Sequence, residues 1–571
     1  MTTPSGTTNL SAAQAFGAAL KRHGITVMFG QSNPPALFLA AADFGIEQIT
    51  YRTENAGAIM ADGYARASGR VPVVTAQNGP AATLLVPGLA EAYKASIPMV
   101  ALVQDLPRPN RDRNAFQEID EIALYQGVSK WLRRIDTVER IDDYIDMAFT
   151  AAASGRPGPA VLLAPWDLID EPQAPGSPRT AELGQVPLDR TLADPARIDE
   201  AAQLLAEAER PLICAGGGVH SSKAWDELAR LQELAGLPVA TTTMGKGAVD
   251  ERHPLSIGVI GYFMGERGMT KFLKPMVEEA DVILLVGNRT NQNGTDSWQL
   301  FPPGARFIHL DIDGNEVGRN YEALRLVGDA KLTLAALSRA LEARDLAARH
   351  AGRAALEAQI AEGRAKHEEE ARAMLTSEAR PIRPERLMAE LDALLRDDDI
   401  VVADASYASI WVANYLKARR GGQRFLTPRG MAGLGWGLPL AIGAKLAKPE
   451  ARVFCLTGDG GFAHCWSELE TVRRHGLKIV LTVLNNGTLA YQGHAEDVWY
   501  GRHTSAIAIS PIDHAMIAHA CGLNGIRVEE AKDYRPALEE AAASDQTTLI
   551  DVITDPRASP PITMYEGKKK D

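Results

Sequence analysis

Two short apolar segments separated by a helical one constrain the fold of this chain more than any other feature. The segments RVFCLTG, residues 452–458, and KIVLTVLNN, residues 478–486, have the length and the β-branched content of buried strands. Between them, CWSELETVRR carries apolar residues at helical spacing. A strand, a helix and a second strand in this order predict a β-α-β unit, in which the two strands run parallel.

The same alternation of helix and strand continues through three blocks of the chain, which has 571 residues and is too long for a single core. We therefore predict an α/β fold with three doubly wound parallel sheets. The predicted domains are residues 8–172, 195–345 and 381–555. A Pro-rich linker at 173–194, an Ala-rich and charged connecting helix at 346–380 and a polar tail at 556–571 complete the chain.

Charge and hydropathy argue against two classes of partner. The net charge of −12 and the pI near 5.6 predict a surface that repels phosphate backbones, which argues against a nucleic-acid partner. No apolar run approaches the roughly 18 residues of a membrane span, and the N-terminus lacks the pattern of a signal peptide. We expect a cytoplasmic enzyme without a membrane partner.

The turn between the first strand and the helix has the composition of a metal and diphosphate site. Gly458 and Gly460 allow a tight turn whose backbone N–H groups can face an anion. Asp459 and Asn486 follow the two strands, so their side-chain oxygens lie at the same edge of the sheet and suit Mg²⁺. An ordinary turn would explain the Gly-Asp-Gly alone, but the Asn-Asn pair after the next strand favours the metal site.

Gly-Asp-Gly, a helix, a strand and then Asn-Asn resemble the signature of thiamine diphosphate enzymes. The order of three α/β domains is similar to that family over essentially the whole chain. The resemblance implies a pyrimidine-binding first domain, a nucleotide-binding-like central domain and a third domain that binds the diphosphate. It also implies that Asp459, Asn486 and the backbone carbonyl of Thr488 hold Mg²⁺. Three glycines would contact the diphosphate: Gly458, Gly460 and Gly461.

The segment ITYRTENAGAIMADGYARASGR, residues 49–70, resembles the family's pyrimidine domain. Glu54 follows a predicted strand and opens a helix rich in small residues, where an ordinary salt bridge is the alternative role. The resemblance implies that Glu54 hydrogen-bonds the aminopyrimidine ring and so promotes loss of the thiazolium proton. Family members often have His before this glutamate, whereas this chain has Thr53.

Two further segments match cofactor-binding loops of the family. RGMAGLGWGLPLAIGAKLA, residues 429–447, places Leu434 where an apolar side chain supports the bent cofactor, and the carbonyl of Ala432 where it receives the 4′-amino group. ADASYASIW, residues 403–411, resembles the loop around the diphosphate and implies contacts from Ser406 and Tyr407. Ordinary strand-to-helix corners are the alternative for both segments.

Within the family, the chain most resembles the acetolactate synthase type. In DRNAFQEID, residues 112–120, Phe116 and Gln117 match residues that reach the active centre, and Lys130 matches another family position. This resemblance implies a carboligase or lyase that acts on pyruvate or another small 2-oxo acid. The absence of a His-His pair disfavours a simple 2-oxo acid decarboxylase, which stays an alternative.

The central segment also follows the acetolactate synthase order. In that family the glycines at 216–218 and the arginine at 289 contact FAD, so Gly216, Gly217, Gly218 and Arg289 are candidate nucleotide contacts. The segment GVIGYFMGERG, residues 258–268, departs from the usual flavin-contacting sequence. FAD, ADP and an empty pocket are therefore all compatible with the sequence.

Substrate and assembly depend on less familiar segments. Tyr491 and His494 are candidate specificity residues in AYQGH, although His494 can also be read as a surface histidine. A 2-hydroxyacyl-CoA lyase or an oxalyl-CoA decarboxylase is the second interpretation, with an acyl-CoA substrate whose phosphates could meet Lys568 to Lys570. A solvated tail is the alternative for these three lysines. The family resemblance further implies a homodimer or a homotetramer.

Overall fold

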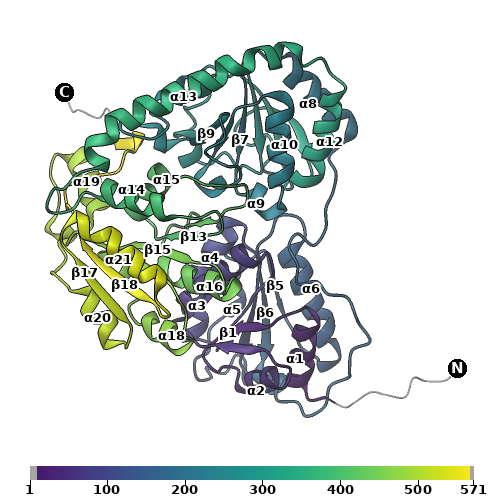
Figure 1. Ribbon diagram of the computed structural model, residues 1–571. Coiled ribbons are helices and arrows are strands. Elements are labelled where there is room, and N and C mark those ends of the chain that lie inside the picture. The colour runs from purple at the N-terminus through teal and green to yellow at the C-terminus, as the bar shows by residue number, and fades with distance from the viewer. Residues whose placement is uncertain (1–9, 566–571) are drawn as a thin grey trace. The chain divides into compact units, whose positions relative to one another are not determined.

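The structure is a computed structural model that describes residues 10–565, and this part of the chain contains three β-sheets of six strands each (Figure 1). Every strand pairing within the three sheets is parallel. With helices between the strands, the predicted α/β class is confirmed. Residues 8 and 9 of the first predicted domain and the predicted basic residues Lys568 to Lys570 lie outside the described residues.

The first sheet has the strand order β2-β1-β3-β4-β6-β5. Its longest strands, β4 and β6, are buried over their whole length, as parallel strands with helices on both faces are expected to be. The strands are β1 (Val27–Phe29), β2 (Glu47–Ile49), β3 (Val73–Ala76), β4 (Met99–Asp105), β5 (Trp131–Arg134) and β6 (Pro159–Pro165). The helices are α1 (Ala12–Arg22), α2 (Pro35–Asp43), α3 (Glu54–Ser68), α4 (Pro80–Ala95), α5 (Glu121–Tyr125), α6 (Ile141–Ala153) and α7 (Trp166–Ile169).

The central sheet has the order β12-β11-β10-β7-β8-β9. Its strands are β7 (Pro211–Ala215), β8 (Val239–Thr241), β9 (Ser256–Val259), β10 (Val282–Val286), β11 (Arg306–Asp311) and β12 (Ala323–Val327). Its helices are α8 (Pro195–Glu207), α9 (Gly218–Ser222), α10 (Trp225–Ala235), α11 (Lys274–Glu278) and α12 (Ala330–Glu342). The long helix α13 (Ala347–Leu375) follows, and its Gly363 lies so close to Leu273 that a Cβ atom there would come within 2.5 Å of the leucine.

The third sheet has the order β14-β13-β15-β16-β18-β17. Its strands are β13 (Ile400–Ala403), β14 (Phe425–Leu426), β15 (Val453–Gly458), β16 (Val480–Asn485), β17 (Asn524–Val528) and β18 (Thr548–Ile553). The helices of this part of the chain are α14 (Pro384–Leu394), α15 (Tyr407–Tyr415), α16 (Gly437–Ala447), α17 (Asp459–Phe462), α18 (Glu468–Arg474), α19 (Ala490–Tyr500), α20 (His514–Ala520) and α21 (Ala531–Ala543).

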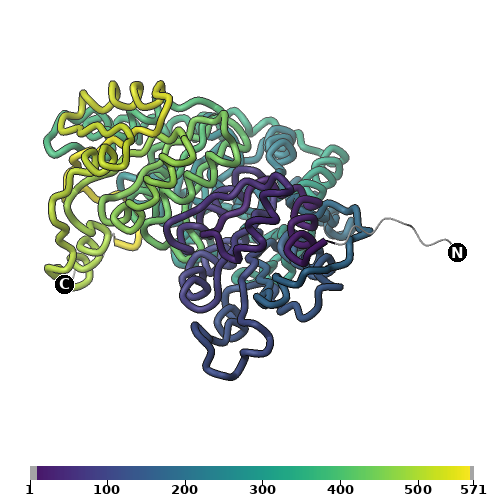
Figure 2. The backbone as a smooth tube through the Cα atoms, turned by 90° about the horizontal axis from the view of Figure 1, so that it is seen from below, coloured from purple at the N-terminus to yellow at the C-terminus, as the bar shows by residue number. Residues whose placement is uncertain are grey.

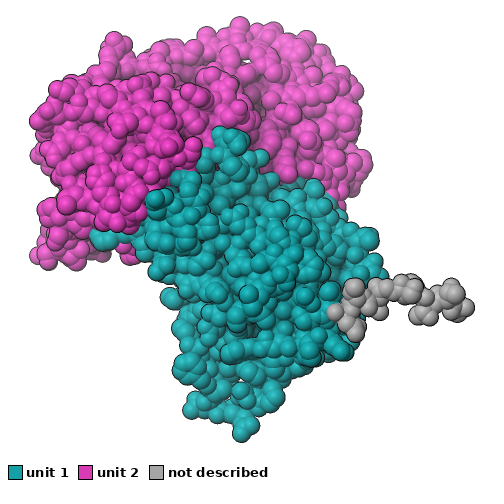
Figure 3. Space-filling view, turned by 60° about the horizontal axis from the view of Figure 1, so that its bottom comes forward, with its two compact units in different colours: residues 1–189, 428–450, 465–477 teal, residues 190–427, 451–464, 478–571 magenta. Residues whose placement is uncertain are grey.

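The chain folds into two compact units, which Figure 3 shows in different colours, and Figure 2 traces the backbone from one end of the chain to the other. The first unit contains the residues up to 189 together with 428–450 and 465–477, and the second contains the remainder. Helices α16 and α18 therefore belong to the first unit, although they connect strands of the third sheet.

Helix α16 crosses α3 inside the first unit at very short range. A Cβ atom on Gly63 of α3 would lie 2.2 Å from the carbonyl oxygen of Leu440, and one on Gly443 of α16 would lie 1.9 Å from that of Met60. Only glycine leaves room for two backbones at this separation. The small residues in both helices are thus explained by the crossing.

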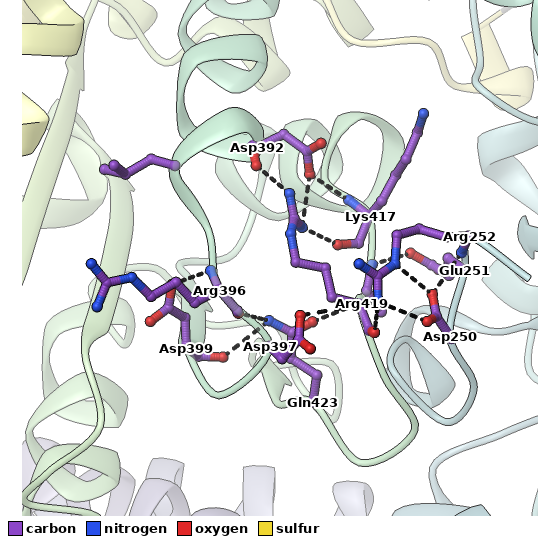
Figure 4. Close-up of polar contacts among 12 residues, drawn as sticks. Asp250, Glu251, Arg252, Asp392, Arg396, Asp397, Asp399, Lys417, Arg419 and Gln423 are labelled. Carbon is purple, nitrogen blue, oxygen red and sulfur yellow. Dashed lines mark hydrogen bonds and ion pairs between the residues drawn. The ribbon is translucent and has the colours of Figure 1, made fainter.

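In the second unit, polar contacts connect a central-domain loop with the segments around β13 and β14 (Figure 4). The backbone N–H of Ala418 donates to the Glu251 carboxylate at 2.7 Å, and the N–H of Glu251 donates to the carbonyl of Ala418 at 3.0 Å. Arg419 donates to Asp392 at 3.3 Å, and Arg252 donates to the carbonyl of Arg419. These contacts fix the 417–423 segment against the central domain.

Between residues 10 and 565, none of the helices is both long enough and apolar enough to cross a membrane.

Candidate functional site

Three predicted binding segments meet at one edge of the third sheet. Strands β13, β15 and β16 are neighbours, and Ser406, Asp459 and Asn486 each follow the carboxyl end of one of them. Because the strands are parallel, these three ends share the edge at which open α/β sheets bind ligands. The structure therefore brings the residues of this half of the predicted site together within the second unit.

Asp459 is the buried first residue of α17, and backbone N–H groups hold both of its carboxylate oxygens. Oδ1 accepts the N–H of Gly460 at 2.9 Å, and Oδ2 accepts the N–H of Gly487 at 2.7 Å. Burial raises the pKa of Asp459, and these hydrogen bonds oppose that effect only in part. A cation beside this carboxylate would offset the cost of its burial, so the residue fits a metal ligand.

The loop after β16 adds further oxygen atoms that could bind a cation together with Asp459. Asn486 accepts the N–H of Thr488 with its side-chain oxygen at 3.1 Å, and the Thr488 hydroxyl donates to the carbonyl of Ile507 at 3.2 Å. No three His, Cys, Asp or Glu side chains within residues 10–565 form a group that could hold a metal ion. A cation at Asp459 would therefore need amide and carbonyl oxygens and the oxygens of a bound ligand, as Mg²⁺ commonly uses.

The segment before α15 has a strained backbone. Ser406 has φ 64° and ψ −144°, a conformation that costs free energy for a residue with a Cβ atom and that often marks a ligand-binding segment. Tyr407 is buried, and its hydroxyl lies 2.8 Å from Nδ1 of His494. His494 is half-buried, with its ring 4.9 Å from the ring of Tyr565, and burial lowers its pKa. His494 and Tyr491, whose ring lies 5.6 Å from that of Tyr407, thus line a shared aromatic cluster.

In the first unit, Glu54 is the first residue of α3 and is buried. The side chain of Thr53 caps the helix by accepting the N–H of Ala56. Thr53, which stands where family members often have histidine, therefore acts as the helix cap in this chain. Burial is the main reason that the pKa of Glu54 is raised. A carboxyl group that keeps its proton to higher pH is suited to a hydrogen bond with a ring nitrogen.

The loop between β4 and α5 carries Phe116 and Gln117, the two residues that the resemblance places near the active centre. The Phe116 side chain is 85% exposed, which is unusual for a large apolar residue. Gln117 has φ 64°, and its side-chain oxygen accepts a hydrogen bond from Gln77 at 3.1 Å. A Cβ atom on Gly79 would lie 2.7 Å from the Cβ of Gln117, so glycine is required for the loop to lie this close.

Lys130 lies apart from these two residues. It precedes β5, at the amino-terminal edge of the first sheet, and its ammonium group donates to the carbonyl of Ser154 at 2.6 Å. Gln117 follows β4 and lies at the opposite, carboxyl-terminal edge. The first sheet therefore does not bring Lys130 to Gln117 within one chain.

The loop before α16 holds Ala432 and Leu434, both exposed, in the first unit. Ala432 has φ 58°, a left-handed conformation that is uncommon for alanine. The Glu91 carboxylate of α4 accepts N–H groups from this loop. Glu91 was not singled out from the sequence, where the only sign is a charged residue among the small residues of GLAEA.

Glu121 is a second buried carboxyl group that the sequence did not single out. Its Oε1 accepts the N–H of Gly79 at 3.2 Å, and no described residue hydrogen-bonds to its Oε2. Burial is the main cause that raises its pKa to about 7, and the nearby charge of Asp105 adds to the effect. The Glu121 carboxyl group therefore titrates near pH 7. It binds Gly79, which packs against the loop that carries Gln117.

In the central domain, close packing accounts for the glycine run. The N–H of Gly216 donates to the carbonyl of Val286 at 2.8 Å, and that of Gly218 donates to the carbonyl of Gly287 at 3.0 Å. A Cβ atom on Gly216 would lie 2.3 Å from the Gly287 oxygen. The N–H groups of two of the candidate nucleotide contacts thus form hydrogen bonds inside the protein. Gly217 and Arg289 remain candidate contacts of a nucleotide. The positive charge of Arg289 also acts on the buried carboxyl group of Asp311.

Comparison with known proteins identifies three matching family models. The model described as "Thiamine pyrophosphate enzyme, N-terminal TPP binding domain" matches residues 10–124. The central-domain model of the same enzymes matches residues 198–337, and the model of their C-terminal TPP binding domain matches residues 404–552. The three matches thus follow the three sheets in order.

Relatives with similar sequences cover nearly the whole chain. A probable acetolactate synthase large subunit of Methanocaldococcus jannaschii is 34% identical over 578 residues, which cover 98% of this chain and 94% of the relative. The acetolactate synthase isozyme 2 large subunit of Escherichia coli is 30% identical over 552 residues, with 96% of each chain covered. A chloroplastic acetolactate synthase of Arabidopsis thaliana is 30% identical over 94% of this chain and 80% of its own length.

Proposed function

We propose that this chain, which belongs to the thiamine pyrophosphate enzyme family, is a carboligase or lyase of the acetolactate synthase type that acts on pyruvate or another small 2-oxo acid. The observation that carries the proposal is the position of Asp459 and Asn486 at the ends of two adjacent parallel strands. A buried carboxylate and an amide oxygen at this edge suit a metal that binds a diphosphate.

Asp459, Asn486 and the carbonyl of Thr488 would hold Mg²⁺, and the metal would bind the cofactor diphosphate. The turn at Gly458, Gly460 and Gly461 and the strained segment at Ser406 and Tyr407 would surround the diphosphate. The raised pKa of Asp459 supports this assignment, since a bound cation would favour its ionised form.

When bound, thiamine pyrophosphate supplies an electron sink for the carbon–carbon bond that is broken or formed. The protein's part begins with Glu54, which would hold a proton at the ring nitrogen of the aminopyrimidine. Burial of Glu54 supports this role, because it raises the pKa of the carboxyl group, which then keeps its proton to higher pH than an exposed glutamate does. The carbonyl of Ala432 would accept a hydrogen bond from the 4′-amino group, and the apolar side chain of Leu434 would support the bent cofactor.

Phe116 and Gln117 would select the second reactant. Gln117 presents an amide that can hydrogen-bond a carbonyl or hydroxyl oxygen, while exposed Phe116 can limit access to the reacting atoms. Tyr491 and His494 would shape the pocket from the aromatic cluster beside the metal loop. Lys130 would take part only if a partner subunit places it there.

The central domain would bind FAD or ADP through Gly217 and Arg289. The charge of Arg289 supports a phosphate contact, whereas the internal hydrogen bonds of Gly216 and Gly218 reduce the support from the glycine run. The second function, a 2-hydroxyacyl-CoA lyase or oxalyl-CoA decarboxylase, has no structural observation in its favour.

A homodimer or homotetramer would be the active form. Four large apolar side chains of the first unit, Leu84, Phe116, Met431 and Leu434, are at least 39% exposed, which supports cover by another subunit. Sedimentation at assay concentration tests this expectation, and a fully active monomer would contradict it.

The proposed activity is tested by incubating the protein with thiamine pyrophosphate, Mg²⁺ and either pyruvate, other 2-oxo acids or 2-hydroxyacyl-CoA esters. Mass spectrometry should find ligated 2-hydroxy-2-methyl-3-oxo acids from pyruvate. Cleavage of the CoA esters alone would instead establish the second function. Omitting Mg²⁺ gives the control for metal dependence.

A further inference from the structure

The Glu91 carboxylate forms a hydrogen-bonded support beneath the loop before α16. It accepts the backbone N–H groups of three consecutive residues, Gly430 at 2.8 Å, Met431 at 2.5 Å and Ala432 at 3.3 Å. The Glu91 side chain is 1% exposed, so water does not compete for these bonds. Three donors converging on one carboxylate fix the direction of the peptide units that follow.

Buried charges hold Glu91 in place from the other side. The guanidinium of Arg66 lies 3.6 Å from Oε1 of Glu91 and binds both oxygens of Asp62, at 2.6 Å and 3.0 Å. All three side chains are buried, and the pair Asp62 and Arg66 lies on α3, the helix that Glu54 opens. The loop is thereby connected to the same helix as the proposed proton-holding residue.

The backbone of the loop before α16 has a conformation that allows the close approach of Glu91. A Cβ atom on Gly430 would lie 2.5 Å from the carbonyl oxygen of Glu91 and 3.0 Å from its carboxylate, so only glycine allows the approach. Two residues later, Ala432 takes its left-handed conformation while its N–H still points to Glu91. The unusual backbone of Ala432 and the Glu91 contact thus belong to one arrangement.

We propose that Glu91 is a positioning residue that sets the Ala432 carbonyl and the Leu434 side chain for the aminopyrimidine ring. This inference rests on the proposed function. It assigns to Glu91 a task that neither the metal ligands nor Glu54 can perform, which is to shape the loop that receives the ring rather than the diphosphate.

The test compares two ligands that both bind the diphosphate half of the proposed cofactor site. Inorganic diphosphate with Mg²⁺ needs only the metal edge at Asp459, whereas thiamine pyrophosphate also needs the ring-binding loop. In Glu91→Gln, one carboxylate oxygen becomes an amide that donates, so it repels a backbone N–H. We expect the Kd of thiamine pyrophosphate, measured by titration calorimetry, to rise at least tenfold while the Kd of inorganic diphosphate stays within twofold.

Glu47→Gln, an exposed substitution in the same unit, should leave both dissociation constants unchanged. If Glu91→Gln fails to give a cooperative thermal transition, Gly430→Ala provides the second variant, because its new Cβ displaces the loop without removing a charge. Unchanged affinity for thiamine pyrophosphate in the folded variant, or an equal loss for both ligands, would overturn the inference. Failure of the wild-type protein to bind thiamine pyrophosphate would instead overturn the proposed function.

Discussion

The carboxylate of Asp459 and the backbone N–H of Gly487 lie 2.7 Å apart, which joins the turn after β15 to the loop after β16. A metal at this carboxylate would therefore also order the second loop. We expect Asp459→Ala to lower the affinity for thiamine pyrophosphate and Mg²⁺ by orders of magnitude, because a charged ligand is lost. Asp497→Ala, an exposed change on α19, is the control. Full cofactor retention by Asp459→Ala would rule out the assignment.

Replacing Glu54 by Gln should slow proton exchange at the thiazolium carbon of the bound cofactor. The amide preserves shape but cannot hold the proton in the same way, and loss of a proton-transfer partner typically costs about 10²- to 10⁴-fold. Hydrogen–deuterium exchange followed by NMR after acid quench measures this step without a substrate. Exchange at the wild-type rate in Glu54→Gln would remove the proposed role.

Gln117→Ala should leave that exchange intact and change the products instead. If the amide orients the second reactant as proposed, its removal should favour protonation by water and so yield more aldehyde and less ligated product. Product ratios from pyruvate, measured by gas chromatography, report the effect. Gln126→Ala, an exposed glutamine after α5, serves as the matched change. An unaltered product ratio would argue against a role for Gln117 in selectivity.

Glu121 should make stability depend on pH in a defined direction. Its pKa is raised from 4.5 to about 7, so between these values the unfolded chain releases a proton that the folded protein keeps. The contribution of Glu121 to the free energy of unfolding therefore falls as the pH rises through this window, by up to about 3 kcal/mol. Glu121→Gln removes the effect, and urea unfolding at pH 5 and pH 8 should show the variant gaining stability relative to the wild type. An equal difference at both pH values would contradict the assigned shift.

The crossing of α3 and α16 should not tolerate a methyl group. In Gly63→Ala the new Cβ would lie 2.2 Å from the carbonyl oxygen of Leu440, so the backbone of α3 or α16 would have to move. Overpacking of this kind costs about 1–3 kcal/mol, so the thermal unfolding temperature should fall. Gly127→Ala is the matched control, since no atom lies within 4 Å of the added Cβ. A Gly63→Ala variant as stable as the control would show that the helices can separate without cost.

The metal edge of the third sheet could be predicted from the sequence because it depends only on local sequence patterns. The strands on either side of Asp459 are apolar runs, and a residue that follows a parallel strand must lie at the carboxyl edge, so the metal edge could be inferred. Glu91 and its loop are separated by 339 to 341 residues, and no periodicity connects a helix of small residues with a turn so distant.

The glycine run at 216–218 shows a different limit. Glycine is required wherever backbone approaches closely, whether the neighbour is a diphosphate or another strand end. Here Gly287 is the neighbour of both Gly216 and Gly218, and the sequence alone could not distinguish these two causes.

The return of α16 and α18 to the first unit has a consequence for biosynthesis. The chain leaves this unit after residue 189 and comes back only at residue 428, so the face of α3 that receives α16 stays uncovered while the intervening segment is made. At about 5–20 residues per second, translation of that segment takes on the order of ten seconds or more. A fragment ending at residue 189 would expose the glycines of α3 and leave Glu91 without the amides that it binds. The ribosome-bound nascent chain should therefore be most vulnerable to aggregation and to chaperone capture during this interval.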